Sequence, residues 1–316
     1  MIDASLTPFH GGELEAQARA GQFSRGGGIR GFMPDQHRLF FAELPWFFAG
    51  ILDAQGWPLA TVLTGPPGLI ESPTPNTLIV RALPSTQDPA AEAFQAGAGI
   101  GLLGIQFETR RRNRANGTIA AVGETGFSVA VTQSFGNCAK YIQTRTIEGW
   151  TVPGSAEAVE FTRLDAPARQ LIAAADTFFM ASAAGTDAGA AAGIDMSHRG
   201  GRPGFVRIDD DALTVPDFAG NSYFNTLGNL LREPRAALLF VDFRTGTVLQ
   251  LQGAVEILWN DPEAARLDGA ERLWRFHVGR GWRRENALPL RWSAPAYAPT
   301  TLQTGLWDQP ALASAV

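Results

Sequence analysis

The stretch from Asp195 to Ile208, "DMSHRGGRPGFVRI", brings a serine, a histidine and two arginines together beside a glycine-rich turn. A serine next to a histidine suggests a hydrolase. That interpretation fails, because successive side chains on a strand point to opposite faces, so Ser197 and His198 cannot face each other. No G-x-S-x-G turn surrounds the serine either. Arg199 and Arg202, beside glycines that leave backbone amides accessible, favour an anion site, with a solvent-facing hairpin turn as the alternative.

A second group of cations lies in the first half of the chain, in "ETRRRNRANG". On a strand, Arg110, Arg112 and Arg114 would share one face. Guanidinium groups bind phosphate or carboxylate through paired hydrogen bonds, which would make this hairpin an anion clamp. The alternative is a solvated hairpin edge, where arginines discourage pairing with other chains.

Polar residues also surround the start of a predicted helix at 222–234, in "PDFAGNSYFNTLGNLLREP". These residues are Asn221, Asn225, Thr226 and Asn229. Backbone amides and hydroxyls at a helix start suit an anion. Asn221 could equally be an ordinary N-cap.

Other motifs predict no chemistry. Gly99, Gly101 and Gly104 spell G-x-G-x-x-G, but a helix is expected before them and a strand after, the reverse of a dinucleotide site. The four histidines are scattered and cysteines are not paired, so no metal site is predicted. Cys138 beside Lys140 is interpreted as a structural thiol rather than an activated one.

Composition sets the broad class. The chain has 316 residues, 45% of them hydrophobic and 18% charged, with a formal net charge of −5. This balance gives no global attraction to nucleic acid or to an anionic membrane, and neither is expected as a partner. The single cysteine, the absence of an apolar leader and the short apolar runs predict a cytoplasmic protein.

The chain contains an internal repeat at an offset of 136 residues. "GPPG" at 65–68 matches "GRPG" at 201–204, and the strand-like segment 100–119 matches 236–255. Each copy is expected to contain many short antiparallel strands and one helix, at 88–97 and 222–234, closed into a barrel. The predicted units are an N-terminal arm (1–38), a first copy (39–150), a second copy (165–292) and a C-terminal tail (293–316).

The second copy resembles a known family. Its "DMSHRGGRPGF" and "NTLGNLLREPRAALLF" are similar to motifs of the pyridoxamine 5′-phosphate oxidase-like group of FMN-binding split β-barrels. The similarity covers about 176–292 and is greatest to an uncharacterised branch with tandem copies. It implies a mainly β fold, a tandem duplicated split barrel with flanking helices, and FMN between the barrels.

The resemblance also implies where the flavin lies: along the strand of residues 197–199, with its phosphate near the start of the helix. The full predicted cofactor site is Met196, Ser197, His198, Arg199, Asn221, Asn225, Thr226, Asn229, Arg110 and Arg112. One departure is important. Phe224, Asn225 and Thr226 stand where true pyridoxamine phosphate oxidases carry Ser-Arg-Lys. Pyridoxamine phosphate is therefore not the expected substrate, and Arg199 or arginines of the first copy would hold the phosphate.

The predicted function is that of an FMN-dependent oxidoreductase acting on a small organic substrate or a redox carrier, with a small-molecule or electron-transfer partner. Catalytic residues are not assigned, although His198 is the best candidate proton donor. The alternative is a non-catalytic flavin-, haem- or deazaflavin-binding module or a scaffold. A homodimer is expected from the relatives, although a duplicated chain could build the equivalent interface within itself.

Overall fold

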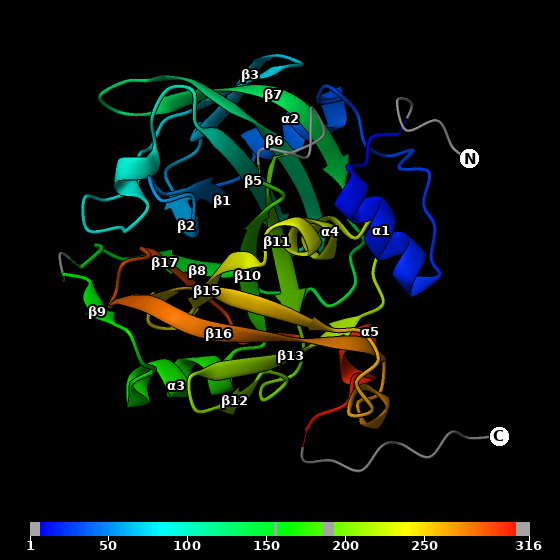
Figure 1. Ribbon diagram of the computed structural model, residues 1–316. Helices are drawn as coiled ribbons and strands as arrows, with labels where there is room; N and C mark the ends of the chain where they lie inside the picture. Colours follow the sequence, from blue (N-terminus) through cyan, green and yellow to red (C-terminus); the bar gives the residue numbers. More distant parts are fainter. Residues whose placement is uncertain (1–6, 155–156, 186–192, 308–316) are drawn as a thin grey trace.

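Two antiparallel sheets dominate the computed structural model, which describes residues 7–154, 157–185 and 193–307 (Figure 1). The first sheet has the spatial order β2-β1-β5-β6-β7-β4-β3. Its strands are β1 (Trp46–Leu52), β2 (Pro58–Thr64), β3 (Ile70–Thr74), β4 (Thr77–Val80), β5 (Gly99–Gln106), β6 (Arg111–Val122) and β7 (Phe127–Gly136).

The second sheet has the order β11-β10-β14-β15-β16-β13-β12, and β9 pairs with β16 beside this path. Its strands are β9 (Val159–Phe161), β10 (Thr177–Ala183), β11 (Ile194–Gly200), β12 (Arg207–Asp209), β13 (Ala212–Phe218), β14 (Arg235–Val241), β15 (Val248–Leu258) and β16 (Ala270–Arg284). A small separate sheet joins β8 (Ile147–Trp150) to β17 (Leu290–Trp292).

The two large sheets follow the same path, which confirms the predicted duplication. Replacing each strand of the first copy by its counterpart in the second turns one spatial order into the other. The irregularities repeat as well. The register of β6 against β7 shifts just before Gly117, and that of β15 against β16 shifts just before Gly253. A Cβ at either glycine would lie 2.1 Å from a backbone oxygen of the facing strand, so the bulge requires glycine in both copies.

The matched turns also have matched backbones. Gly68 has a φ of +88° and Gly204 has a φ of +87°, in the left-handed region that glycine adopts without strain. Residues that match in the sequence repeat therefore adopt the same backbone conformation in the two copies.

Each barrel encloses its own apolar core, and a third cluster of buried residues joins the two barrels. At its centre Phe48 and Phe179 stack, with ring centroids 3.4 Å apart and planes at 19°. These two residues are equivalent, because Phe48 pairs with Leu103 and Phe179 pairs with Leu239 in matching strands. Contact between equivalent residues means that the barrels are related by an approximate two-fold axis passing close to this pair.

The helices differ more from the expectation than the strands do. They are α1 (Gly11–Ala20), α2 (Asp35–Ala42), α3 (Ala166–Ala174), α4 (Asn225–Arg232), the short α5 (Pro299–Leu302) and the 3₁₀ turns η2 (Ala91–Ala93) and η4 (Ala264–Arg266). The prediction of a helix at 88–97 is wrong, because only the single turn η2 forms there. None of the helices in the described ranges is long and apolar enough to cross a bilayer.

The ends of the chain carry more structure than an arm and an extended tail. Residues 7–38 hold α1 and the start of α2, while residues 293–307 run along the second barrel, pair Ala296 with Thr144 and include α5. The outer parts of these two predicted units, 1–6 and 308–316, lie outside the described residues. The expected helix at 222–234 begins only at Asn225, because Ser222 and Phe224 adopt left-handed φ values of 59° and 60°.

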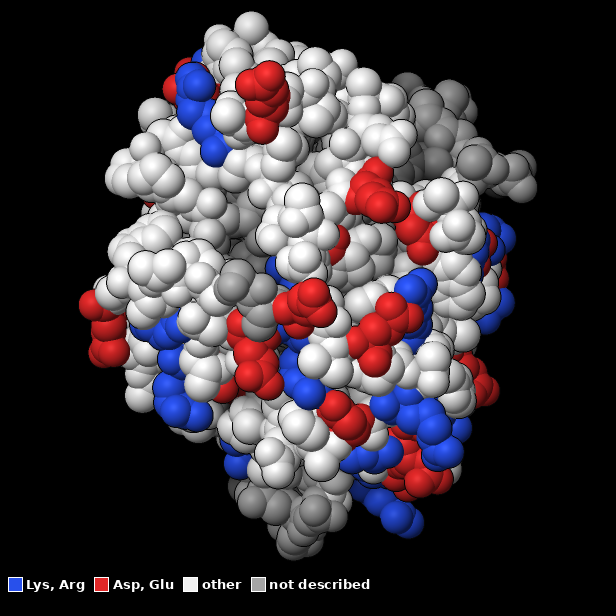
Figure 2. Space-filling view, turned by 90° about the vertical axis from the view of Figure 1, so that its left-hand side faces the viewer, with Lys and Arg blue, Asp and Glu red and all other residues white. Residues whose placement is uncertain are grey.

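Charge is unevenly distributed over one face of the molecule. In the space-filling view, charged side chains are sparse over the upper part, where the first barrel lies (Figure 2). Over the second barrel below, acidic and basic side chains are numerous and interspersed. Among the described residues on this face there is accordingly no broad patch of one sign.

Candidate functional site

Strand β6 of the first barrel faces strand β11 of the second, and three side chains on one face of β6 cross the gap between them. These side chains share a face because alternate residues of a strand point the same way. The cross-barrel hydrogen bonds are Arg112 Nη1 to His198 Nδ1 (2.9 Å), Arg114 Nη2 to Ser197 Oγ (2.8 Å) and Asn116 Nδ2 to Asp195 Oδ1 (2.8 Å). Ser197 and His198 contact different partners, as strand geometry predicts.

A cavity of about 90 Å³ lies beside these contacts, between β11, the start of α4 and the start of β6. Seven of the predicted site residues line it: Ser197, His198, Arg199, Asn221, Asn225, Thr226 and Arg112. Four guanidinium groups meet there, those of Arg112, Arg114, Arg199 and Arg272.

The carboxylates around the cavity do not match these cations one for one. Arg199 and Arg272 share the carboxylate of Asp217, at 2.8 Å and 2.6 Å, and Arg272 also donates to Glu271 at 2.9 Å. Arg114 lies 3.4 Å from Asp195. Arg112 hydrogen-bonds to the ring of His198 and forms no ion pair within the described ranges. Burial, followed by the neighbouring Arg114, lowers the pKa of Arg112 to about 9.

Several hydrogen-bond donors at the cavity lack an acceptor. In the described part of the chain, Nε of Arg112, Arg114 and Arg199 and Nε2 of His198 are buried without a partner. A buried donor left without an acceptor costs about 1–3 kcal/mol. Four such groups around one cavity would suit a ligand rich in acceptor atoms, and the surplus of guanidinium groups would suit an anion.

His198 is held as a neutral donor. Since a guanidinium can only donate, the bond from Arg112 requires Nδ1 of His198 to accept, which places the ring proton on Nε2. Burial first, and then the positive charges of Arg112 and Arg199, lower the pKa of His198 well below its ordinary value. The ring therefore offers an N–H to a ligand rather than the positive charge expected of an imidazolium acid.

The start of α4 contributes polar groups that already have protein partners. Thr226 Oγ1 lies 2.8 Å from Ser197 Oγ, and the side chain of Asn225 donates to Glu13. Asn221 accepts from the backbone N–H of Tyr223 at 3.1 Å and stays at the cavity edge.

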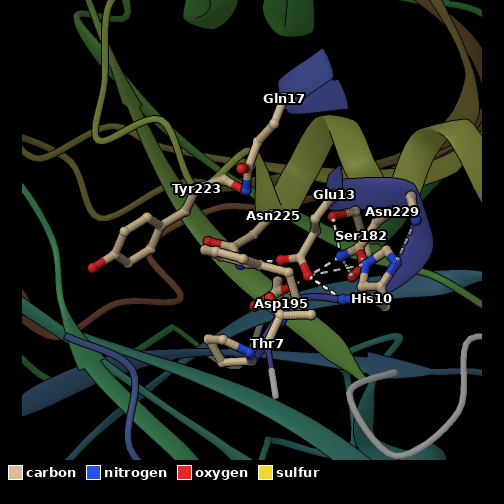
Figure 3. Close-up of polar contacts among 12 residues, drawn as sticks. Thr7, His10, Glu13, Gln17, Ser182, Asp195, Tyr223, Asn225 and Asn229 are labelled. Atoms are coloured by element: carbon tan, nitrogen blue, oxygen red, sulfur yellow. Dashed lines mark hydrogen bonds and ion pairs between the residues drawn. The ribbon is translucent and has the colours of Figure 1, made fainter. Parts of the chain in front are cut away.

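Helix α1 packs across α4 and covers this end of the cleft (Figure 3). The two helices approach closely at glycines: a Cβ at Gly12 would lie 2.2 Å from the carbonyl oxygen of Gly228. His10 Nε2 lies 2.9 Å from Asn229 Oδ1, and Asn229 Nδ2 donates to Asp195 at 2.9 Å. The contact between the helices is therefore largely a network of buried polar groups.

Glu13 is the most unusual member of this network. The residue is 3% exposed, and its carboxyl group accepts from the backbone N–H of His10 at 2.9 Å as well as from Asn225. Burial, followed by the nearby Asp195, raises the pKa of Glu13 to about 8. The group is consequently mostly protonated near neutral pH.

Three predicted site residues lie away from the cavity. Arg110 was expected on the same strand face as Arg112, and that is wrong: it lies in the turn before β6 with a φ of 53°. Met196 is completely buried in the core between the barrels, on the face of β11 opposite Ser197. Asn229 is 1% exposed and lies in the network under α1. Arg202, discussed with the glycine-rich turn, donates to the carbonyl of Thr304.

The predicted set omitted groups that the fold brings to the site. Arg114 is two residues from Arg112 on the same strand face, so strand periodicity could have added it. Asp195 follows from the same periodicity, two residues before Ser197. Glu13 has no signal in the sequence, because it is far from the cleft along the chain. Cys138 is half-buried beside Arg112 and lines a neighbouring cavity of about 60 Å³.

The two-fold axis generates a second, equivalent cleft, and the protein's own side chains fill it. Thr61, Gln250 and Gln252 stand where the first cleft has Ser197, Arg114 and Asn116, at the repeat offset. Arg284 and Asp88 form a buried ion pair there at 2.5 Å. Thr61 and Gln250 donate to the same carboxylate at 2.5 Å and 2.9 Å. Only the cleft at Ser197 therefore keeps unpartnered donors among these described positions.

The residues present fit one end of the cofactor that the sequence resemblance implies. The unpartnered donors and surplus cations suit the phosphate of FMN. A cavity of about 90 Å³ is too small for the flavin ring, since pockets for molecules of that size span roughly 300–1,000 Å³. A larger cavity of about 520 Å³ continues along the cleft and is lined by Glu13, Asn116 and Asp195.

Comparisons with known proteins gave matches among solved structures only. No family model matches the chain, and no curated protein matches it. The chain is similar to a putative pyridoxamine 5′-phosphate oxidase from Lactobacillus delbrueckii (14% identity, TM-score 0.31, 40% of this chain and 98% of that one). It is also similar to HupZ of Group A Streptococcus (15% identity, TM-score 0.30, 40% and 98%). HutZ of Vibrio cholerae, a heme storage protein, matches at 12% identity and a TM-score of 0.28, over 39% of this chain and 95% of that one.

Proposed function

We propose that this chain is an FMN-dependent oxidoreductase whose single flavin site lies in the cleft between β6 and β11. The observation that carries the proposal is the group of buried, unpartnered donors on Arg112, Arg114, Arg199 and His198 around one cavity. Bound FMN would supply the electron or hydride transfer, and the protein would supply position and electrostatics.

The chain's own residues would act mainly on the phosphate. Arg112 and Arg199 would each donate charge-assisted hydrogen bonds worth about 1.5–3 kcal/mol, and the Nε2–H of His198 would add a neutral donor. A dianionic phosphate would also raise the pKa of Arg112, which burial holds at about 9 in its absence. Asn116 and Asp195 line the larger cavity, where they could bind the polar edge of the ring.

A small organic molecule or a redox carrier would be the second substrate, as the sequence predicts. The cleft is built from two strands of one chain, so it does not need a second chain to complete it. Association of two chains remains a prediction that native mass spectrometry can test.

A haem-binding function is the second candidate, because His198 carries a buried, unpartnered ring nitrogen. The same ring argues against it. Nε2 carries the proton while Arg112 donates to Nδ1, so binding iron would require His198 to lose that contact or its proton. FMN is therefore the favoured cofactor.

Titration of the protein with FMN and with riboflavin, followed by flavin fluorescence, tests the proposal. We expect FMN to bind at least tenfold more tightly than riboflavin, which lacks the phosphate, and Arg199→Ala to remove most of that difference. Arg111→Ala is the matched control, because Arg111 lies on the opposite face of β6 and stacks on Phe40.

Equal affinity for the two flavins, or undiminished FMN binding by Arg199→Ala, would contradict the phosphate site. A Soret band on adding hemin, with no response to FMN, would favour the haem alternative. If the protein binds neither FMN nor hemin, the proposal is wrong and a non-catalytic scaffold role is favoured.

A further inference from the structure

Another cavity, away from the cleft between β6 and β11, lies where the C-terminal segment crosses the second barrel. Its volume is about 510 Å³, and it lies between the end of α3, the start of β10, the turn after β14 and the residues that follow β17. We call it the Arg145 pocket and define it by Arg145, Asp176, Thr177, Phe243, Trp292 and Tyr297.

The polar groups of the Arg145 pocket are buried and only partly satisfied. Arg145 and Asp176 are each 5% exposed, and Nη2 of Arg145 donates to both carboxylate oxygens, at 2.8 Å and 2.6 Å. Within the described ranges, Nε and Nη1 of Arg145 and Oγ1 of Thr177 are buried without a hydrogen-bond partner. Since native proteins rarely leave such groups unpaired, three of them on two residues that line one cavity point to a ligand that completes their bonding.

Aromatic rings form a wall of the pocket. The guanidinium of Arg145 lies 4.2 Å from the centroid of Phe243. Trp292 packs edge-on against Phe243, with centroids 5.4 Å apart and an angle of 85°. Tyr297 also lines the cavity. A cavity of this volume with aromatic walls and a few polar groups is typical of a site for a planar small molecule.

The charges of the pocket select against an anion. The positive charge of Arg145 is balanced by the negative charge of Asp176. At the rim, the exposed Arg244 lies beside Asp242, whose carboxylate accepts a hydrogen bond from the backbone N–H of Arg244. With two positive and two negative groups, the lining has no net charge to attract a carboxylate. The adjacent guanidinium and carboxylate instead present donors beside acceptors, which match a ligand edge that carries a carbonyl oxygen next to an N–H.

We infer that the Arg145 pocket is a second ligand site, which binds an uncharged planar heterocycle with adjacent C=O and N–H groups, as in a cyclic imide or lactam. The carbonyl accepts from Arg145 and the N–H donates to Asp176, while the ring packs on the aromatic wall. This site is separate from the proposed flavin site, and the inference does not depend on the identity of the cofactor there.

Lumazine, a fused heterocycle with an imide edge, is a suitable probe, and its 1,3-dimethyl derivative lacks the imide N–H. The measurement is isothermal titration of the full-length protein at mildly acidic pH, where lumazine is uncharged. We expect lumazine to bind and dimethylation to weaken binding about tenfold or more, because Asp176 would then face a methyl group. 2-Naphthoate, a planar anion of similar size, should bind more weakly than lumazine.

Two variants locate the site without breaking the buried Arg145–Asp176 pair. Ala174 is exposed and lines the cavity at the end of α3, so Ala174→Trp should block lumazine binding. Ala173→Trp is the matched control, because Ala173 is exposed but lies outside the lining and should leave the affinity unchanged. Thr177→Val removes an unpartnered hydroxyl and should weaken binding about three- to tenfold if that hydroxyl contacts the ligand.

Four results would overturn the inference. They are no binding of lumazine, equal binding of its dimethyl derivative, tighter binding of 2-naphthoate, and full affinity in Ala174→Trp. A loss of lumazine binding in Arg112→Ala but not in Ala174→Trp would assign the probe to the cleft between the barrels instead. Because the probes carry no phosphate, this outcome differs from failure of the proposed FMN site.

Discussion

Replacement of Glu13 by glutamine tests whether the contact of α1 with α4 depends on a protonated carboxyl group. The ordinary pKa of a glutamate is 4.5, and burial followed by the nearby Asp195 raises that of Glu13 to about 8 in the folded protein. Between these values the folded state binds more protons than the unfolded state. The contribution of Glu13 to stability is therefore fully present below about pH 4.5 and is lost as the pH rises to 8.

The size of the effect follows from this difference in pKa. Each pH unit within the window changes the free energy of unfolding by about 1.4 kcal/mol per proton, so between about pH 5 and pH 8 Glu13 should destabilise the fold by about 3 kcal/mol. Glu13 is only 3% exposed, so solvent does little to screen this effect. Glutamine keeps the shape and removes the titration, so Glu13→Gln should be more stable than the parent at pH 8, with a flatter pH dependence.

Urea unfolding at about pH 5 and pH 8, followed by circular dichroism, measures this difference. Glu15→Gln is the control, because Glu15 lies on the same helix but is only half-buried, and its carboxylate pairs with Arg19 and with Arg232 of α4 at the surface. Each of these pairs should contribute less than about 1 kcal/mol at either pH. If the free energy of unfolding of Glu13→Gln and of the parent protein changes equally with pH, the carboxyl group of Glu13 is not buried in its protonated form.

Two further predictions concern the features that make the clefts unequal. Arg284→Met should lower the free energy of unfolding, measured by chemical denaturation, by about 3–5 kcal/mol, because it leaves the carboxylate of Asp88 buried without its cation. Adding Asp88→Asn to this variant should restore much of the lost stability. If the two substitutions instead cause additive losses, the pairing is contradicted. Gly228→Ala places a Cβ 2.5 Å from the backbone nitrogen of Glu13, so α1 should detach and tryptic cleavage of the N-terminal arm should accelerate about tenfold or more. Gly149→Ala is the control, because its Cβ meets no atom within 4 Å and the cleavage rate should stay unchanged. Equal cleavage rates for both variants would show that the close approach of the helices does not hold α1.

The strands could be predicted from the sequence because they are specified locally and repeated. Gly117 and Gly253 recur at the repeat offset because the bulge beside each leaves no room for a side chain. The cross-barrel contact of Arg112 with the Ser197–His198 strand was also anticipated, as an arginine hairpin lent to a shared cleft. The first inference rests on the internal repeat at an offset of 136 residues, and the second rests on that repeat together with the family resemblance.

The helices and the buried polar contacts were less predictable because they depend on distant partners. The helix expected at 88–97 is reduced to η2, and Asp88 at its start is buried in an ion pair with Arg284, nearly 200 residues away. Glu13 would be expected on an exposed helix face, yet α4 buries it through the glycine contact. Nothing in the local sequence around either carboxylate indicates these partners.

In the proposed site, Arg112 of the first barrel completes an anion site on the second barrel. Isothermal titration of FMN into Arg112→Ala, with Arg111→Ala as the reference, is the decisive measurement. We expect one site per chain for the parent protein and for Arg111→Ala, and binding about tenfold weaker or more for Arg112→Ala. Binding of FMN by Arg112→Ala with undiminished affinity, or two equal sites per chain, would contradict the proposed site.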